Sequence, residues 1–169
     1  MKPSDDVFDH AVPHEAGHVL VAYCFGVVVK QIAYRITTEL RGQIISEIAA
    51  PSHASRKLTD EERQAHCLIA AAGMAGELVA TGEYDRGNLS PGNADKKMVS
   101  MLSSVGITDF LQPAQDIIVR NSQGFYHLCS ALRKKYPRVR EQIISSGRPG
   151  IYPLLSKEEL DKVLAGVEW

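Results

Sequence analysis

The chain has 169 residues, of which 44% are hydrophobic and 23% charged. This is enough for one globular domain with a buried core and too little for two. Nineteen Lys and Arg balance twenty Asp and Glu, so the net charge does not indicate binding to nucleic acid or to an anionic membrane. The three cysteines form no C-x-x-C pair, which argues against a disulfide framework and a thiolate zinc finger. We therefore expect one domain over residues 1–169.

The N-terminus lacks the apolar segment of a secretory signal. Residues 1–10 include several aspartates, and their longest apolar run is Val7-Phe8. The longest apolar stretch of the chain, residues 19–29, is shorter than the roughly 20 residues that a membrane-spanning helix needs. We therefore expect a cytoplasmic protein without a membrane anchor.

The first element that the sequence predicts is a helix over about residues 12–25. Its apolar residues recur at helical spacing, and they are Val12, Ala16, Val19, Leu20, Ala22 and Tyr23. Gly26 supplies an end to this helix, and Pro13 suits its start better than its interior.

A β-ribbon is predicted next. Residues 27–34 and 43–48 are rich in β-branched side chains, and we expect them to form two strands that turn near Gly42. The polar residues 51–58 are expected to link this ribbon to the following helix.

Residues 59–62 predict the start of a second helix. A threonine there precedes a glutamate by three positions, which is the pattern of a capping box. The alanine-rich sequence that follows predicts a long helix up to Gly82.

Residues 84–90 are expected to form a loop. Residues 90–91 resemble an N-cap followed by proline, and they predict a further helix that ends near Gly106.

The C-terminal third has a helical pattern as well. Apolar residues at spacings of three or four predict a helix over about residues 114–136, which Pro137 interrupts. Ser156 and Glu159 form a second capping-box pattern, before a last helix over residues 157–165. The expected fold class is mainly α, a helical array with a small two- or three-stranded β-ribbon.

The segment His14-Glu15-Ala16-Gly17-His18 carries the pattern H-E-x-x-H inside the first predicted helix. At about 100° per residue, its two histidines lie roughly 40° apart and one turn apart, so both imidazoles can reach one metal ion. Glu15 falls within the same arc, where a base can accept a proton from a zinc-activated water. The alternative is a helix whose histidines face solvent or fill the core.

A catalytic zinc site needs a third protein ligand and leaves its fourth position to water. The sequence offers several candidates from separate elements, namely His10, His53, His66, His127, Glu77, Asp85 and Asp95. The longer signature H-E-x-x-H-x-x-G-x-x-H is absent, because Val21 and Phe25 stand where its glycine and last histidine would be. We therefore do not expect a metzincin site.

Three segments resemble the peptidase domain of the FtsH-type ATP-dependent zinc proteases. Residues 14–21 are similar to the family's H-E-A-G-H-A motif and the hydrophobic residues after it, and residues 72–78 are similar to its G-G-R-A-A-E-E helix. Residues 92–95 resemble its glycine-containing N-D motif. The order and approximate separation of the three segments agree, and the resemblance covers residues 12–106.

The resemblance implies a fold like that of the FtsH peptidase domain and a role for five residues. His14, His18 and Asp95 would bind Zn²⁺. Glu15 would be the catalytic base. Glu77 would accept a hydrogen bond from the outer ring nitrogen of a ligating histidine and so fix its tautomer.

Two of these assignments have alternatives. Asp95 could instead stabilise the N-terminus of its own helix, in which case Asp85 is the next candidate ligand. Glu77 could be a plain surface charge on its helix. The sequence also departs from the family at Pro13, where an aromatic residue is usual, and at Met74, where arginine is usual.

The expected function is that of a stand-alone zinc metalloendopeptidase. The sequence contains no G-x-x-x-x-G-K-[ST] loop, so we expect no ATPase module, and the expected substrates are peptides or flexible protein segments. The strand at residues 43–48 could receive such a peptide at its edge, as the resemblance suggests, or could simply be part of a hairpin packed on the first helix. Two other functions stay open: a catalytically silent zinc domain that binds a peptide or partner, and metal-assisted hydrolysis of a non-peptide amide.

Overall fold

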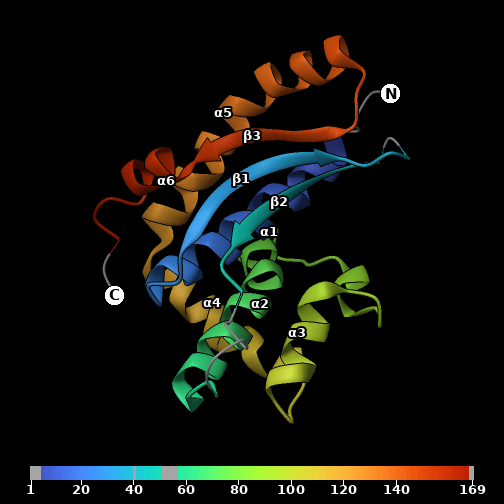
Figure 1. Ribbon diagram of the computed structural model, residues 1–169. Helices are drawn as coiled ribbons and strands as arrows, with labels where there is room; N and C mark the ends of the chain where they lie inside the picture. The colour runs from blue at the N-terminus through green and yellow to red at the C-terminus, as the bar shows by residue number, and fades with distance from the viewer. Residues whose placement is uncertain (1–4, 40, 51–56, 168–169) are drawn as a thin grey trace.

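The computed structural model describes residues 5–39, 41–50 and 57–167. These residues form a mainly helical protein with a small antiparallel sheet, as predicted (Figure 1). The helices are α1 Asp5–Cys24, α2 Asp60–Thr81, α3 Ala94–Leu102, α4 Leu111–Arg120, α5 Ser122–Ser146 and α6 Lys157–Val163. The strands are β1 Val29–Ile36, β2 Gly42–Ile48 and β3 Gly150–Ser156, and two short 3₁₀ helices are η1 Arg86–Leu89 and η2 Ile107–Phe110.

The sheet has the strand order β2-β1-β3, and both pairs of strands are antiparallel. β1 and β2 form the predicted ribbon, with Tyr34 opposite Ile44. The sequence does not predict where the third strand lies, because Pro153 interrupts its pattern. Pro153 is accommodated beside an irregularity in the pairing of β3 with β1, which is typical of an edge strand. β2 therefore forms the opposite edge of the sheet.

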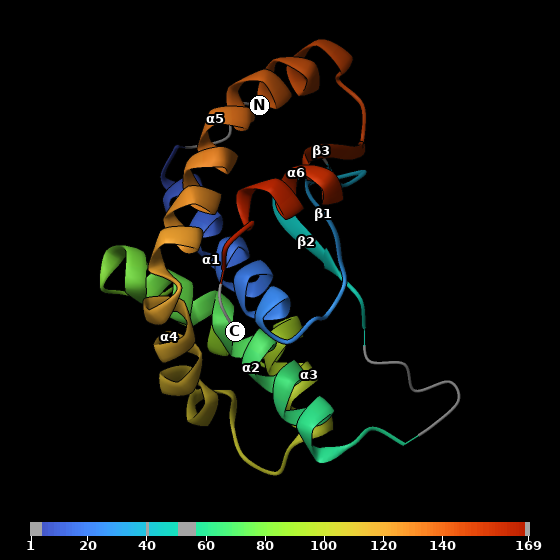
Figure 2. The ribbon, with the colours of Figure 1, turned by 90° about the vertical axis from the view of Figure 1, so that its left-hand side faces the viewer.

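Helix α1 lies between the sheet and helix α2 (Figures 1 and 2). It contacts β2 on one side and α2 on the other. Its residues Ala16, Val19 and Leu20 are completely buried, and Phe125 and Leu128 of α5 belong to the same core. The H-E-x-x-H segment is thus held in the interior by packing on several sides.

The close approach of α1 and α2 depends on small residues. A Cβ atom added to Gly17 would lie 2.1 Å from the carbonyl oxygen of Ala72, and one added to Gly76 would lie 2.2 Å from that of Pro13. Real Cβ atoms essentially never come so near another heavy atom. The two glycines therefore let the backbones of α1 and α2 touch, which brings α2 directly against the histidines of α1.

The predicted limits of α2 are confirmed. The Thr59 side chain accepts a hydrogen bond from the Glu62 amide, and the Glu62 side chain accepts one from the Thr59 amide. The helix ends at Gly82, which has a positive φ of 81° that glycine adopts without strain. The predicted capping box before α6 is present too, between Ser156 and Glu159.

The predicted start of the first helix is wrong. α1 begins at Asp5, so Pro13 lies inside it. Proline cannot donate to the carbonyl four residues earlier, here that of Asp9, but Asp9 is exposed and water can replace the lost donor. Pro13 itself is buried, with its carbonyl against Gly76. Packing against α2 therefore outweighs the local preference for a helix start.

The third helix also begins later than predicted. Asn93 caps α3, because its side-chain oxygen accepts hydrogen bonds from the amides of Asp95 and Lys96. The residues from Ser90 to Asn93 form a turn before it. The helix ends at Leu102. Gly106, the predicted end, is instead the N-cap residue of η2.

The helix predicted over residues 114–136 is two helices. They are divided at Asn121, whose side-chain amide donates to the carbonyl of Ile117 and so competes with the helical backbone pattern. Pro137 does not end the second helix, because α5 continues to Ser146. Pro137 lies on the exposed side of α5.

Further expectations concern the cysteines and the linker. Cys67 and Cys129 are buried in the core, Cys24 is half-buried, and all three are free thiols. Residues 51–56 of the predicted linker lie outside the described residues. Among the described helices, none has the length and apolar character needed to span a membrane.

Candidate metal centre

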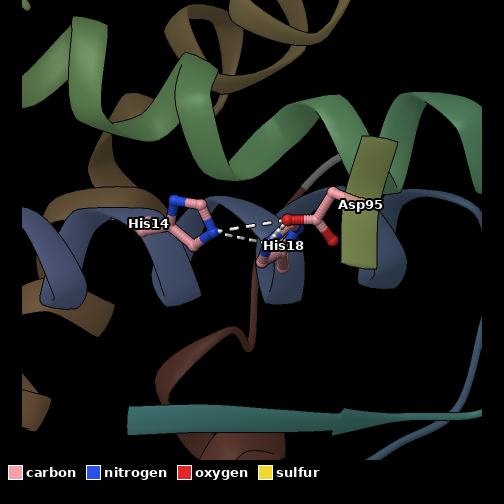
Figure 3. Close-up of side chains that lie close together, drawn as sticks. All are labelled: His14, His18 and Asp95. Carbon is pink, nitrogen blue, oxygen red and sulfur yellow. Dashed lines mark hydrogen bonds and ion pairs between the residues drawn. The ribbon is translucent and has the colours of Figure 1, made fainter. Parts of the chain in front are cut away.

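Three of the predicted ligands converge in the structure. His14 and His18 lie one turn apart on α1, and Asp95 extends towards them from the first turn of α3 (Figure 3). The two Nε2 atoms are 3.0 Å apart. The Asp95 Oδ2 atom lies 3.6 Å from the Nε2 atom of His14 and 3.4 Å from that of His18.

These distances fit one zinc ion. Zinc ligands in a tetrahedral site lie about 2.0–2.1 Å from the metal, so two neighbouring ligand atoms are about 3.3 Å apart. The three observed distances, 3.0, 3.4 and 3.6 Å, bracket this value. Within the described residues, no fourth His, Cys, Asp or Glu joins this group. The donor set can thus hold a metal with a coordination position left for another molecule.

The hydrogen bonds behind the rings decide which atoms face the centre. The Nδ1 atom of His18 lies 2.7 Å from the Ile69 carbonyl oxygen, and because a carbonyl only accepts, this nitrogen donates. The Nδ1 atom of His14 lies 2.5 Å from the Glu77 carboxylate. A neutral imidazole then has a lone pair on Nε2. Two such lone pairs and the Asp95 carboxylate face one another, an arrangement that favours a cation between them.

The pKa values show the same preference for positive charge. Burial disfavours a charged imidazole, but hydrogen bonds to Asp95 and Glu77 outweigh it and raise the pKa of His14 to about 10. Asp95 likewise raises the pKa of His18 against the effect of burial. Although burial acts to raise the pKa of Asp95, the neighbouring imidazoles of His18 and His14 hold it well below its usual range.

Glu77 is a buried group, since only 2% of it is exposed, and the alternative of a surface charge is wrong. Besides His14, its carboxylate accepts hydrogen bonds from the Asp85 amide at 2.6 Å and from the Asn88 side chain at 2.8 Å. The Nδ1 atom of His10 lies 3.4 Å away. Burial opposes ionisation, but the bonds from His14 and from the Asp85 amide outweigh it and lower the pKa of Glu77.

Glu15 lies beside the three converging side chains and is half-buried. Its Oε2 atom accepts a hydrogen bond of 2.6 Å from the hydroxyl of Ser46 on β2. Glu15 is not part of the group that could hold a metal. Its carboxylate is therefore held next to the centre by the sheet.

Gly73 provides the space that the histidine rings occupy. A Cβ atom at this position of α2 would lie 2.5 Å from the His14 Nε2 atom and 2.6 Å from the His18 Nε2 atom. Gly73, the Ile69 carbonyl and Ser46 have no role that the sequence predicts. For Gly73 the available signal is a glycine in an alanine-rich predicted helix, between Ala72 and Met74, since this suggests a close helix contact.

A cleft opens beside these side chains. Strand β2 contributes Ile44, Ile45, Ser46 and Ile48 to its lining, and helices α2 and α3 contribute Ile69 and Met98 among others. A second hollow shares His14, Glu15 and Gln43 with the first and reaches residues 84–89, here named the η1 segment, at Tyr84 and Asn88. Both hollows border the candidate centre, and the first forms a groove along the edge strand β2.

The other candidate ligands lie elsewhere. Asp85 accepts a hydrogen bond from the Gly87 amide and caps η1. His66 lines the cleft, and His127 lines a separate hollow on α5, but neither belongs to the group of converging atoms. His53 lies outside the described residues. Among the described alternatives for the third ligand, only Asp95 thus reaches the Nε2 atoms of both histidines.

The three segments that carry the FtsH resemblance meet at this centre. Residues 14–21 supply the two histidines, residues 72–78 supply Gly73 and Glu77, and residues 92–95 supply Asp95. Comparison of the sequence with protein-family models and with curated proteins finds no match.

Proposed function

We propose that the protein is a zinc-dependent metalloendopeptidase of the FtsH peptidase type that cleaves peptides or flexible protein segments. The observation that carries the proposal is the convergence of His14, His18 and Asp95 at the spacing of zinc ligands, with Glu15 beside them. A site that only stabilises a fold normally has four protein ligands, with cysteines prominent, and needs no carboxylate base.

Zinc in such a site lowers the pKa of water from about 16 towards 7 and polarises the scissile carbonyl. Glu15 accepts the proton of the attacking water and delivers it to the leaving amine. The Ser46 hydroxyl donates a hydrogen bond to the Oε2 atom of Glu15, so we assign the proton transfer to the Oε1 atom. Glu77 and the Ile69 carbonyl keep the Nδ1 atoms of the two histidines protonated, so that each Nε2 atom is free to bind.

The substrate lies in the groove along β2. Within the described part of the chain, β2 pairs only with β1, so its other edge offers backbone donors and acceptors to an extended peptide. Ile45, Ile48, Ile69 and Met98 in the lining contact apolar side chains of that peptide. Because an extended backbone is needed for this pairing, the substrate is a peptide or a flexible segment rather than a folded domain.

The decisive variant is Glu15→Gln. The wild-type protein should contain zinc after purification and should cleave an unfolded test protein in a reaction that a chelator stops. Glu15→Gln should retain zinc and lose cleavage by a factor of at least about 100, because the proton acceptor is removed while the ligands remain. Bound zinc without hydrolysis of any unfolded protein or peptide library would reject the peptidase and favour a peptide-binding module.

A further inference from the structure

Asn88 contacts the carboxylate that orients His14, although it is far from both in sequence. Its side-chain amide donates to the Oε1 atom of Glu77 at 2.8 Å. The same oxygen accepts the Nδ1–H of His14 at 2.5 Å, while the Oε2 atom accepts the amide of Asp85 at 2.6 Å. The carboxylate is thus held by three donors from α1 and from the η1 segment.

We propose that Asn88 is a positioning residue for the metal centre, acting through Glu77 on the ring of His14. The proposal rests on the zinc site proposed above and adds to it a residue that touches neither the ligand atoms nor the cleaved bond. In this proposal the η1 segment places the side-chain amide of Asn88 against the buried Glu77 carboxylate.

The geometry of the carboxylate explains why a second donor on Oε1 matters. Glu77 is 2% exposed, so its carboxylate depends on donors from the protein, and a buried acceptor that loses a donor costs free energy. If the Asn88 amide is removed, Oε1 keeps only the His14 bond. The carboxylate can then turn about its last torsion, and the imidazole that it orients turns with it.

Asn88 is itself fixed by bonds that do not involve Glu77. The backbone N–H of Asn88 donates to the backbone carbonyl of Asp85, and the Asp85 side chain accepts the backbone N–H of Gly87. The Lys96 ammonium donates to the Leu89 carbonyl at 2.8 Å, which ties η1 to α3. Since Lys96 directly follows Asp95, the same short segment is connected to two of the three candidate ligands. The donor is therefore already in place before a metal binds.

The test measures zinc affinity in Asn88→Asp, by competition of Zn²⁺ with a chelator of known affinity. This change keeps the size of the side chain but places a carboxylate against Glu77. We expect the dissociation constant for zinc to rise by about tenfold or more, the usual effect of losing a partner of a ligating histidine. The visible absorption of the Co²⁺-loaded variant should shift as well, because it reports the ligand geometry.

The matched control is Asn121→Asp, since Asn121 is also half-buried and its amide donates to a backbone carbonyl, but at the junction of α4 and α5. It should leave zinc affinity and the Co²⁺ spectrum unchanged. Asn88→Ala removes the donor without adding charge, and it tests the proposal if Asn88→Asp does not fold. We expect its zinc affinity to fall by about tenfold.

Zinc affinity within twofold of wild type in the Asn88 variants, with only a lower melting temperature of the metal-free protein, would overturn the proposal and make Asn88 a loop anchor. None of these readouts needs peptide cleavage. A wild-type protein that binds zinc but cleaves nothing would reject the peptidase and leave the role of Asn88 measurable, whereas a wild-type protein that binds no zinc would reject both.

Discussion

At the scale of single residues, the candidate centre depends on which atom each side chain presents. Glu77 and the Ile69 carbonyl both act on Nδ1 atoms, so that the Nε2 atoms of His14 and His18 face Asp95. The acceptor behind each ring is as important as the ring itself, because a histidine with the other tautomer would present a proton to the position of the proposed metal.

Replacing Asp95 tests the third ligand. Asp95→Asn keeps the shape of the side chain but removes the charge that faces the two imidazoles, so we expect zinc affinity to fall by more than about tenfold. Asp85→Asn is the control, because an asparagine oxygen can still accept the Gly87 amide. Chelator competition measures both. A larger loss in Asp85→Asn than in Asp95→Asn would reassign the ligand.

How much of the centre is predictable depends on how local its signals are. His14, Glu15 and His18 are predictable, because helical periodicity alone puts them together. Asp95 is singled out from Asp85 only by the family resemblance, since both lie in polar segments. Ser46 is not predictable, because its partner Glu15 is distant in sequence and their contact exists only after β2 packs on α1.

At the scale of elements, the contact between α1 and α2 determines the space around the histidines. The backbones touch at Gly17 and Gly76, and Gly73 lies over the two Nε2 atoms. The candidate centre therefore lies against the polypeptide backbone of α2 at Gly73, which has no side chain.

Gly73→Ala tests this arrangement. The added Cβ would lie 2.5–2.6 Å from both Nε2 atoms, so the rings must move, and we expect zinc affinity to fall by about tenfold or more. Gly92→Ala is the control, because a Cβ there meets nothing within 4 Å. Calorimetric titration with zinc measures the effect. Unchanged affinity in Gly73→Ala would show that the rings do not occupy this space.

Element limits are predictable where the signal lies within one turn. The capping boxes at Thr59 and Ser156 are local, and both are confirmed. Pro13 and Pro137 give wrong predictions, because both lie inside helices whose tertiary packing outweighs one lost backbone hydrogen bond. The sequence allows for a third strand but does not predict its position, since Pro153 breaks its local pattern but is tolerated at an edge.

At the scale of the whole molecule, the proposed zinc ion joins α1 to α3 and should stabilise the fold. We expect it to raise the melting temperature more at pH 8 than at pH 6. Protons compete with zinc, because the pKa of His14 is raised from 6.5 to about 10, and apparent affinity rises about tenfold per pH unit for each proton released.

The effect of the His14 pKa on the stability of the metal-free protein points in the same direction. Because the pKa of His14 is raised, its charged imidazole stabilises the metal-free fold fully below about pH 6.5, and this stabilisation is lost as the pH rises towards 10. Zinc therefore adds more stability at alkaline pH, where the metal-free fold has lost this contribution. Thermal unfolding with and without zinc at both pH values measures the difference. An equal increase in melting temperature at pH 6 and pH 8 would contradict competition between protons and metal.

The distance along the chain between α1 and α3 also has a consequence for biosynthesis. A ribosome releases His14 and His18 long before it releases Asp95 and the α2 residues that orient the two rings. A nascent chain therefore carries only an unsupported pair of imidazoles, which binds metal weakly, and it has no groove to hold a peptide. Under the proposed function, hydrolysis becomes possible only once α3 has docked, so that neighbouring nascent chains are not cleaved before the fold is complete.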